Sequence, residues 1–347
     1  MGSARLTVDL DAIVANWAAL SRRAGVPAAA TIKADAYGLG AEAVGRALAR
    51  AGCRSFFVAL AEEGAALRRA LGSGPEILIF SGHMAGDAQT LRNLGLTPVI
   101  NSAEQLVRQL EGLPGLPFAI HLDTGMNRLG MEPAEWAAVR DPALAAGPHL
   151  ILSHLACADE PDHLMNGQQL DEFRTLTEGC GVPRSLAATG GVLLGPAFAF
   201  DLVRPGIGLY GGAPFAEARP VVRLDLPVIQ CRTVEPGESV GYAASWVAVR
   251  PTRTATVAAG YADGLLRSLS GRGMLWAGDV PCPILGRVSM DLIVADVSAL
   301  PDDPEELTIL GPRQGIDDLA AAAGTIGYEV LTALGARYRR RYLGGTA

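Results

Sequence analysis

Short apolar runs alternate with helix-like segments over the first two thirds of the chain. Each run is bounded by glycine, proline, serine or aspartate and lacks polar alternation, which is typical of parallel strands buried on both faces. The pattern predicts eight strands, at residues 29–33, 56–60, 76–81, 98–101, 118–123, 150–154, 186–189 and 203–209. Most of the gaps carry a helical pattern, as in 42–51, 61–71, 85–94 and 103–110.

Eight strand–helix units within residues 29–209 predict an α/β fold, a (β/α)8 barrel of the TIM type. A doubly wound open sheet is the alternative. No GxGxxG motif follows the first predicted strand, which disfavours a dinucleotide site.

The pattern changes near Ala218. From 221 to 310 the segments are β-like and separated by turn residues, which predicts a mostly antiparallel β domain. Terminal helices are expected at 317–323 and 328–334, and residues 5–9 resemble a strand that can pair with the β domain. The predicted domains are therefore a barrel at 9–220 and a β-rich domain at 221–347 that includes a strand from 1–8.

Composition narrows the functional classes. The 347 residues include 29 basic and 36 acidic ones, for a net charge of −7, and they form no basic stripe that would bind nucleic acid. The one basic run, 337–341, is interpreted as a solvated helix end. No run of about 18 apolar residues predicts a membrane span, and the first residues lack the apolar region of a secretory signal. Five widely spaced cysteines favour reduced thiols in a cytoplasm over disulfides or a zinc site.

Lysine usage is the most unusual feature of the composition. Lys33 is the only lysine, and all the other basic residues are arginine. Arginine can replace lysine as a surface charge, but a guanidinium stays protonated and forms no Schiff base. Lys33 ends an apolar run, and it is therefore a candidate nucleophile.

Several chemically active groups follow the predicted strands, and in a barrel these strand ends meet at one rim. They are Lys33, Arg128 within the segment 123–128, His154, Thr189 before two glycines, and Arg204 before Gly206 and Ile207. Glycine-flanked turns can offer N–H groups to a phosphate. An amine beside such a turn suggests pyridoxal 5'-phosphate, and a Schiff-base aldolase without a cofactor is the rival interpretation.

These residues lie in motifs that resemble those of alanine racemases. The motif ATIKADAYGLG resembles the family's cofactor-lysine segment, and further matches follow in the same order up to residue 342. They are LDTGMNRLG, SHLACAD, DLVRPGIGLYGG, SVGYAASW, AGYADGLLRSL, ILGRVSMDLIVADVS and GTIGYEVLTALGARYRRRY. The family fold is an α/β barrel followed by a β domain, as the hydrophobic pattern predicts.

The resemblance implies a role for each matched residue. Lys33 would hold pyridoxal 5'-phosphate and act as one catalytic base, and Tyr242 would be the second base on the opposite face of the substrate. The remaining assignments are Tyr37, Thr189, Gly206, Ile207 and Tyr328 for the phosphate, Arg204 and His154 for the ring, Arg128 and Met290 for the substrate, and Tyr261 for the gate. Thr189 stands where serine is usual in the family, and it keeps the hydroxyl.

The resemblance also implies a head-to-tail homodimer in which Tyr242, Tyr261 and Met290 come from the partner subunit. One position departs from the family pattern. His121 replaces a lysine that many members carbamylate to orient the arginine that matches Arg128. We therefore expect a carboxylate or a bound anion to pair with Arg128, with His121 donating a hydrogen bond to it.

The leading prediction is a cytoplasmic racemase that interconverts L- and D-alanine and supplies D-alanine for peptidoglycan. A decarboxylase of basic amino acids on the same fold, and a racemase of broader specificity, are alternative enzymes. A cofactor-carrying homeostasis protein is the non-enzyme alternative, and the β domain argues against it because such proteins are typically a single barrel.

Overall fold

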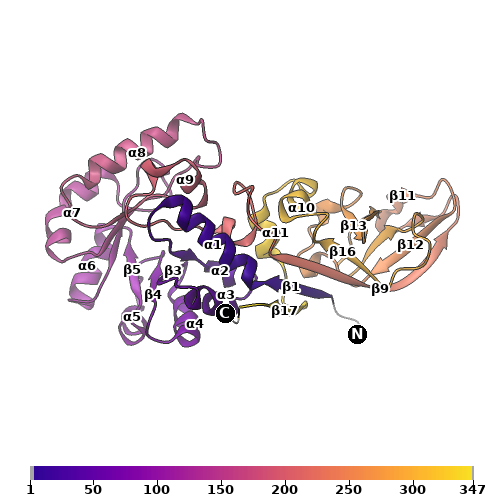
Figure 1. Ribbon diagram of the computed structural model, residues 1–347, viewed down its shortest axis with the longest axis horizontal. Helices are drawn as coiled ribbons and strands as arrows, with labels where there is room; N and C mark the ends of the chain where they lie inside the picture. Colours follow the sequence, from indigo (N-terminus) through magenta and orange to yellow (C-terminus); the bar gives the residue numbers. More distant parts are fainter. Residues whose placement is uncertain (1–3, 346–347) are drawn as a thin grey trace. The chain divides into compact units, whose positions relative to one another are not determined.

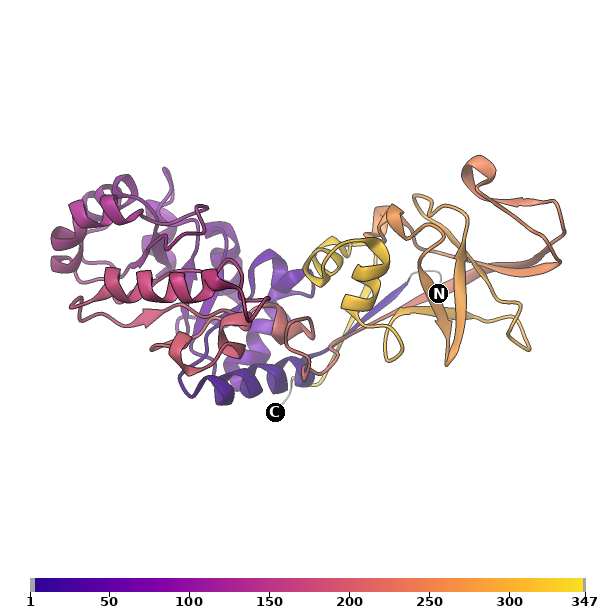
Figure 2. The same ribbon diagram turned by 90° about the horizontal axis from the view of Figure 1, so that it is seen from above.

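The computed structural model describes residues 4–345, which form two compact units. The barrel unit holds residues 13–209 and 213–218, and the β unit holds residues 4–12, 210–212 and 219–344. Figure 1 and Figure 2 show the barrel unit mainly in indigo to magenta and the β unit mainly in orange to yellow. Within residues 4–345, no helix is both long enough and apolar enough to cross a bilayer.

The barrel unit contains a parallel sheet of seven strands that neighbour one another in chain order. The strands are β2 (Ala30–Thr31), β3 (Ser55–Val58), β4 (Glu76–Ile79), β5 (Thr97–Ile100), β6 (Ala119–His121), β7 (Leu150–Leu152) and β8 (Arg184–Ser185). Strands in sequential parallel order require crossover connections, and helices provide them here.

Residues 201–205 close this sheet, although they are too irregular to count as a strand. The Asp201 N–H donates to the Arg184 carbonyl at 3.0 Å on one side, and the Ala29 N–H donates to the Val203 carbonyl at 2.9 Å on the other. The segment therefore bridges the last strand and the first, which confirms the barrel and excludes the open sheet. Pro205 has no N–H to continue the ladder.

Two predicted strands are placed incorrectly by the sequence pattern. The expected strand at 186–189 lies earlier, at β8, and Thr189 instead begins the helix α9 (Thr189–Leu193). The expected strand at 203–209 is reduced to a single bridge between Val203 and Ala28, and Ile207–Tyr210 forms a 3-10 helix. Both errors place short apolar runs in strands where the chain turns into helix.

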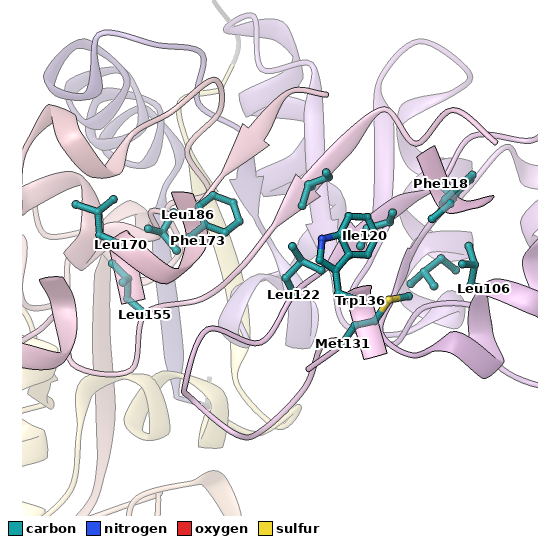
Figure 3. Packing of buried hydrophobic residues seen from close by; sticks show 13 residues of the cluster. Leu106, Phe118, Ile120, Leu122, Met131, Trp136, Leu155, Leu170, Phe173 and Leu186 are labelled. Carbon is teal, nitrogen blue, oxygen red and sulfur yellow. The ribbon is translucent and has the colours of Figure 1, made fainter. Parts of the chain in front are cut away.

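Helices cover the outside of the parallel strands (Figure 1). They are α3 (Ala41–Arg50), α4 (Ala61–Leu71), α5 (Ala88–Leu94), α6 (Ala103–Gly112), α7 (Pro133–Ala145) and α8 (Leu164–Thr177), and α1 (Leu10–Ala24) precedes them, while the short segment α2 (Lys33–Tyr37) has left-handed backbone angles. Figure 3 shows a cluster of buried side chains between these helices and strands β5–β8. Trp136 and Phe173 are its largest members, and each is almost fully buried.

The β unit is built around β9 (Val222–Val234), which pairs with β16 along its first half and with β12 along its second half. The pairing closes a ring of six strands, β12-β15-β14-β13-β16-β9, because β12 also pairs with β15. Its other strands are β12 (Thr252–Val257), β13 (Met274–Ala277), β14 (Val280–Leu285), β15 (Ile293–Asp296) and β16 (Glu306–Leu310), with a separate hairpin of β10 (Ser239–Val240) and β11 (Trp246–Val247).

Segments near both ends of the chain, 4–12 and 316–344, also belong to the β unit. The predicted N-terminal strand is confirmed as β1 (Arg5–Asp9), which pairs with β9. The predicted terminal helices are confirmed as α10 (Ile316–Ala323) and α11 (Gly327–Ala333). The interpretation of 337–341 as a helix end is wrong, because most of the run lies in β17 (Arg339–Leu343), which pairs in parallel with β1.

The buried cluster of the barrel predicts a large stability effect at Phe173. Its ring is fully buried and meets Phe200 edge-to-face with centroids 5.0 Å apart. Phe173→Ala should lower the free energy of unfolding of the barrel unit by roughly 3–5 kcal/mol, measured by denaturant titration. Leu164→Ala is the matched control, since Leu164 lies on the same helix and is 82% exposed. A cost at Phe173 no larger than at Leu164 would contradict this account of the core.

Candidate active site

Lys33 stands directly after β2, at the start of a left-handed turn. Residues Ala34, Asp35 and Ala36 have φ between 52° and 54°, and Tyr37 has φ 56°. Such a conformation costs about 1–2 kcal/mol per residue for side chains other than glycine. A run of these residue types does not predict a left-handed turn, so the turn is not expected from the sequence. The turn makes the chain leave the strand end abruptly and leaves Lys33 at the rim.

Positive charge and partial desolvation act on the Lys33 amine. Its Nζ lies 6.0 Å from the centroid of the Phe80 ring. Loss of water lowers the pKa of Lys33, Arg128 lowers it further, and Glu63 opposes the shift. A lowered pKa increases the neutral fraction of the amine near neutral pH, and the neutral amine is the form that acts as a nucleophile or a base.

Backbone N–H groups and two hydroxyls form a small cradle near Lys33. The Thr189 Oγ1 accepts hydrogen bonds from the N–H groups of Gly206 and Gly208, at 3.1 and 3.2 Å. A Cβ atom on Gly206 would collide with the Tyr37 hydroxyl. Burial also raises the pKa of Tyr37, so the phenol stays protonated and can donate. The hydroxyls of Thr189 and Tyr37, which lie beside the Gly206 turn, can therefore donate to an anion.

Arg204 is a buried cation that is held by neutral groups. Its guanidinium donates to the Ser185 hydroxyl, and it donates to the Ser153 carbonyl at 2.6 Å. The carbon Cζ lies 5.9 Å from the centroid of the Phe57 ring. Burial lowers the pKa of Arg204. Because its partners carry no negative charge, the guanidinium keeps a strong positive potential at the rim.

Two histidines near Arg204 are held neutral. Burial and the charges of Arg204 and Arg128 lower the pKa of His154 to about 3. Burial and Arg204 likewise lower the pKa of His121 to about 3. Neutral imidazoles beside a guanidinium can accept hydrogen bonds but add no charge.

His121 does not behave as the sequence analysis expected. Its Nδ1 lies 2.9 Å from the Asn101 Oδ1, and the Asn101 amide nitrogen donates to the carbonyls of Phe80 and Val99. The Asn101 oxygen is therefore the acceptor, and the His121 Nδ1 carries the proton of the neutral ring. The other nitrogen can only accept, so His121 cannot also donate to an anion at Arg128. Arg128 itself is exposed in this chain.

A buried glutamine links the segment before Arg128 to His154. The Gln169 Nε2 donates to the Thr124 hydroxyl at 3.1 Å and to the His154 carbonyl at 2.9 Å. Thr124 in turn shares a hydrogen bond of 2.9 Å with the Ser153 hydroxyl, beside Arg204. The role of Gln169 is not predictable from the sequence, because a single glutamine on a helix carries no distinctive signal.

Four predicted site residues lie in the β unit: Tyr242, Tyr261, Met290 and Tyr328. Asp263 stabilises the turn that carries Tyr261. Its Oδ2 accepts from the Gly260 N–H at 2.9 Å, and Arg337 binds both of its oxygens at 2.7 Å. The N–H of Ala262 donates to the Met290 carbonyl at 3.0 Å, which ties the Tyr261 turn to the Met290 loop.

The structure therefore brings together the predicted residues of the barrel unit, which are Lys33, Tyr37, Arg128, His154, Thr189, Arg204, Gly206 and Ile207. Their shared contacts and electrostatic interactions place them at one rim. The four residues of the β unit lie on their own turns, and their part in the same site stays a prediction.

Fold and site together define a class of protein, a barrel enzyme with a reactive lysine followed by a β unit. Two family models match the chain: "Alanine racemase, N-terminal domain" over residues 8–214 and "Alanine racemase, C-terminal domain" over residues 221–342. The chain belongs to the alanine racemase family.

Relatives and solved structures agree along the full length. The chain is 64% identical to an alanine racemase of Cereibacter sphaeroides, over 99% of each chain, and 46% identical to a catabolic alanine racemase of Agrobacterium fabrum, over 98% of this chain and 92% of that one. The alanine racemase of Bartonella henselae, solved with covalently bound pyridoxal phosphate, aligns with a TM-score of 0.93 at 35% identity, over 99% of this chain and 100% of that one. The biosynthetic enzyme of Pseudomonas aeruginosa aligns with the same TM-score at 38% identity and the same coverage.

The residues of the rim fit pyridoxal 5'-phosphate. An accessible amine with a lowered pKa can bind the aldehyde, and the hydroxyls of Thr189 and Tyr37 beside the Gly206 turn can donate to the phosphate. A Cβ atom on Gly208 would lie 2.6 Å from a Thr189 carbon, so the two glycines let this turn pack closely against Tyr37 and Thr189. The donors and the positive charge of the rim match the charge of the cofactor.

The cradle predicts a specific loss of cofactor binding. Gly206→Ala should weaken the binding of pyridoxal 5'-phosphate by at least roughly tenfold, because its methyl group would collide with the Tyr37 hydroxyl. The measurement is an equilibrium titration followed by the absorbance of the bound cofactor. Gly167→Ala is the control, since no atom lies within 4 Å of a Cβ atom there. Equal affinities for the two variants would show that the phosphate binds elsewhere.

Proposed function

We propose that Lys33 and Tyr242 are the two bases with which this enzyme of the alanine racemase family interconverts L- and D-alanine, using pyridoxal 5'-phosphate. The observation that carries the proposal is the match of both family models along the chain, with its only lysine at the rim. Full-length relatives named alanine racemase disfavour the decarboxylase and the single-barrel homeostasis protein.

Racemisation requires a proton to leave one face of the α-carbon and another to return to the opposite face. Pyridoxal 5'-phosphate, when bound, withdraws electrons from that carbon and makes its proton acidic. Lys33 can exchange a proton on one face because its pKa is lowered. Although burial lowers the pKa of Arg204 to about 9, its guanidinium stays charged near neutral pH, and His154 is neutral, so neither readily donates a proton there.

Tyr242 serves the opposite face in this proposal, as the base for the L-alanine proton. Arg128 and Met290 bind the substrate, Tyr261 forms the gate, and Tyr328 joins Tyr37 at the phosphate. These assignments rest on the matched motifs. The Ala262 contact supports the gate, because its N–H donates to the Met290 carbonyl and fixes the Tyr261 turn to the Met290 loop, while Asp263 holds the turn itself together.

The active unit in this proposal is a head-to-tail homodimer in which the β unit of one subunit completes the site of the other. The exposure of large side chains on the β unit supports it: Tyr242 is 70% exposed, Val249 88%, Ile229 60% and Met290 53%. A second chain that covers these side chains would remove their apolar surface from water.

The cellular role that we propose is the supply of D-alanine for peptidoglycan, in the cytoplasm. Five free cysteines are consistent with a reducing compartment. The neighbour from Pseudomonas aeruginosa is described as biosynthetic, whereas the relative from Agrobacterium fabrum is described as catabolic.

The cofactor lysine can be tested without ambiguity, because the chain has a single lysine. Borohydride reduction of the purified holoenzyme, followed by peptide mapping, should place the label on the peptide that contains Lys33. Lys33→Arg should bind the cofactor poorly and lose nearly all racemisation of L-alanine, followed by optical rotation. A labelled peptide without Lys33 would refute the assignment.

Complementation tests the second base and the shared site together. Tyr242→Phe should keep the cofactor absorbance while racemisation falls by roughly 10²–10⁴-fold, as for a lost general base. Lys33→Ala should be inactive. Mixed dimers of the two variants should regain activity, because one site then holds both bases. No recovery after confirmed subunit exchange would argue that both bases come from one chain.

A further inference from the structure

Glu63 lies in the first turn of α4, and its carboxylate accepts three backbone hydrogen bonds. The Oε2 atom accepts from Ala59 at 2.7 Å and from Leu60 at 3.3 Å, while Oε1 accepts from Ala34 at 2.7 Å. The bonds at Oε2 are those of an ordinary helix N-terminus. The bond at Oε1 is different, because it joins this helix to the residue that follows Lys33.

The Ala34 N–H is the first donor of the left-handed turn. Inside the turn, the Gly38 N–H donates to the Ala34 carbonyl at 2.8 Å and the Gly40 N–H donates to the Asp35 carbonyl at 2.8 Å. The N–H at the start of such a turn has no partner inside it, as at any helix N-terminus. Glu63 supplies that partner from another element.

The Lys33 backbone is consequently held on both sides by the same neighbouring strand–helix unit. The Ile32 N–H donates to the Phe57 carbonyl on β3 at 2.9 Å, and the Ala34 N–H donates to Glu63 on α4. Four successive residues with positive φ cost energy, so the turn persists only where tertiary contacts fix it. Charge-assisted hydrogen bonds are among the strongest contacts that can do so.

Glu63 also has an electrostatic effect on the Lys33 amine. The groups that face this amine are Arg128, which disfavours its charged form, Glu63, which favours it, and His154, which is neutral. The carboxylate of Asp35, on the same turn, accepts from the Ala41 N–H at 2.7 Å and closes the far end of the turn. Glu63 is thus the acidic group that opposes the positive charge around Lys33.

We infer that Glu63 is a positioning residue for the reactive lysine: its carboxylate fixes the left-handed turn that begins at Ala34 and serves as the counter-charge of the Lys33 amine. The inference takes the role of Lys33 from the proposed function. It concerns how this chain holds the lysine, so it can be measured without turnover.

Hydrogen exchange tests the structural half of the inference, namely that Glu63 fixes the turn that begins at Ala34. In the full-length holoenzyme, Glu63→Gln should make the amides of residues 34–40 exchange roughly tenfold faster, because an amide side chain offers one acceptor oxygen where the carboxylate offers two. The amides of β7 should be unchanged. Glu62→Gln is the matched control, since Glu62 is the exposed neighbour in the same helical turn.

Competitive acetylation tests the electrostatic half of the inference, the effect of the Glu63 charge on the Lys33 amine. Because the chain has a single lysine, the label on a lysine reports on Lys33 alone. The full chain, freed of cofactor, is labelled with acetic anhydride across a pH series, with the N-terminal amine as the internal reference. Removing a nearby negative charge should lower the pKa of Lys33 in Glu63→Gln further, which makes labelling roughly threefold faster below the midpoint. Glu62→Gln should match the wild type.

Wild-type behaviour of Glu63→Gln in both measurements would overturn the inference, and an unchanged midpoint alone would overturn its electrostatic half. If Glu63→Gln also speeds amide exchange in β7, Glu63→Asp is the deciding variant. Its side chain keeps the charge but is one methylene shorter, so exchange should rise at residues 34–40 and not in β7. Unchanged exchange at residues 34–40 overturns the structural half. Failure of the proposed function is a separate result, because it appears in the wild type as a borohydride label away from Lys33.

Discussion

The concentration of positive charge at one barrel rim is the constraint on which the site depends. Arg204 is almost fully buried, yet its partners are a hydroxyl and carbonyl groups, and Arg128 adds a second guanidinium charge. Burial and this positive field together lower the pKa values of His121, His154 and Lys33. A rim of this kind stores unfavourable electrostatic energy that an anion can relieve. The phosphate of a cofactor and the carboxylate of an amino acid are both suited to that role.

The strained turn after Lys33 is, like the charged rim, an unfavourable feature that neighbouring groups compensate. A left-handed run without glycine is unfavourable by itself, and contacts from α4 and from Asp35 hold it in place. Strain that is compensated by neighbouring elements fixes the direction of a side chain more firmly than a relaxed loop does. The lysine therefore leaves the strand end along one defined path, which a base that serves one face of a substrate needs.

Much of this arrangement was predictable from the sequence, and the parts that failed share a cause. The buried strands, the β unit and the importance of Lys33 follow from hydrophobic period and residue usage, because burial and Schiff-base chemistry restrict residue types. The closing segment at 201–205, the turn at 34–37 and the strand β17 depend instead on partners far away in the chain. The roles of Glu63, Gln169 and Asp263 cannot be predicted from the sequence for the same reason. A single polar residue on a helix or a turn has no periodic signal, and its role appears only with the backbone groups that it contacts.

The different demands on arginine and lysine explain why this chain keeps a single lysine. Arg204 occupies a buried place among neutral acceptors, and a guanidinium stays charged there because its charge is delocalised and its pKa, although lowered by burial, remains above neutral pH. Lys33 occupies a more open place where the group must lose its proton, and desolvation with a neighbouring guanidinium favours that loss. The two positions make opposite demands on a cation, so they cannot exchange residues. Elsewhere a positive charge suffices and arginine meets the need, which leaves proton transfer and covalent bonding as the chemistry that keeps a lysine at position 33.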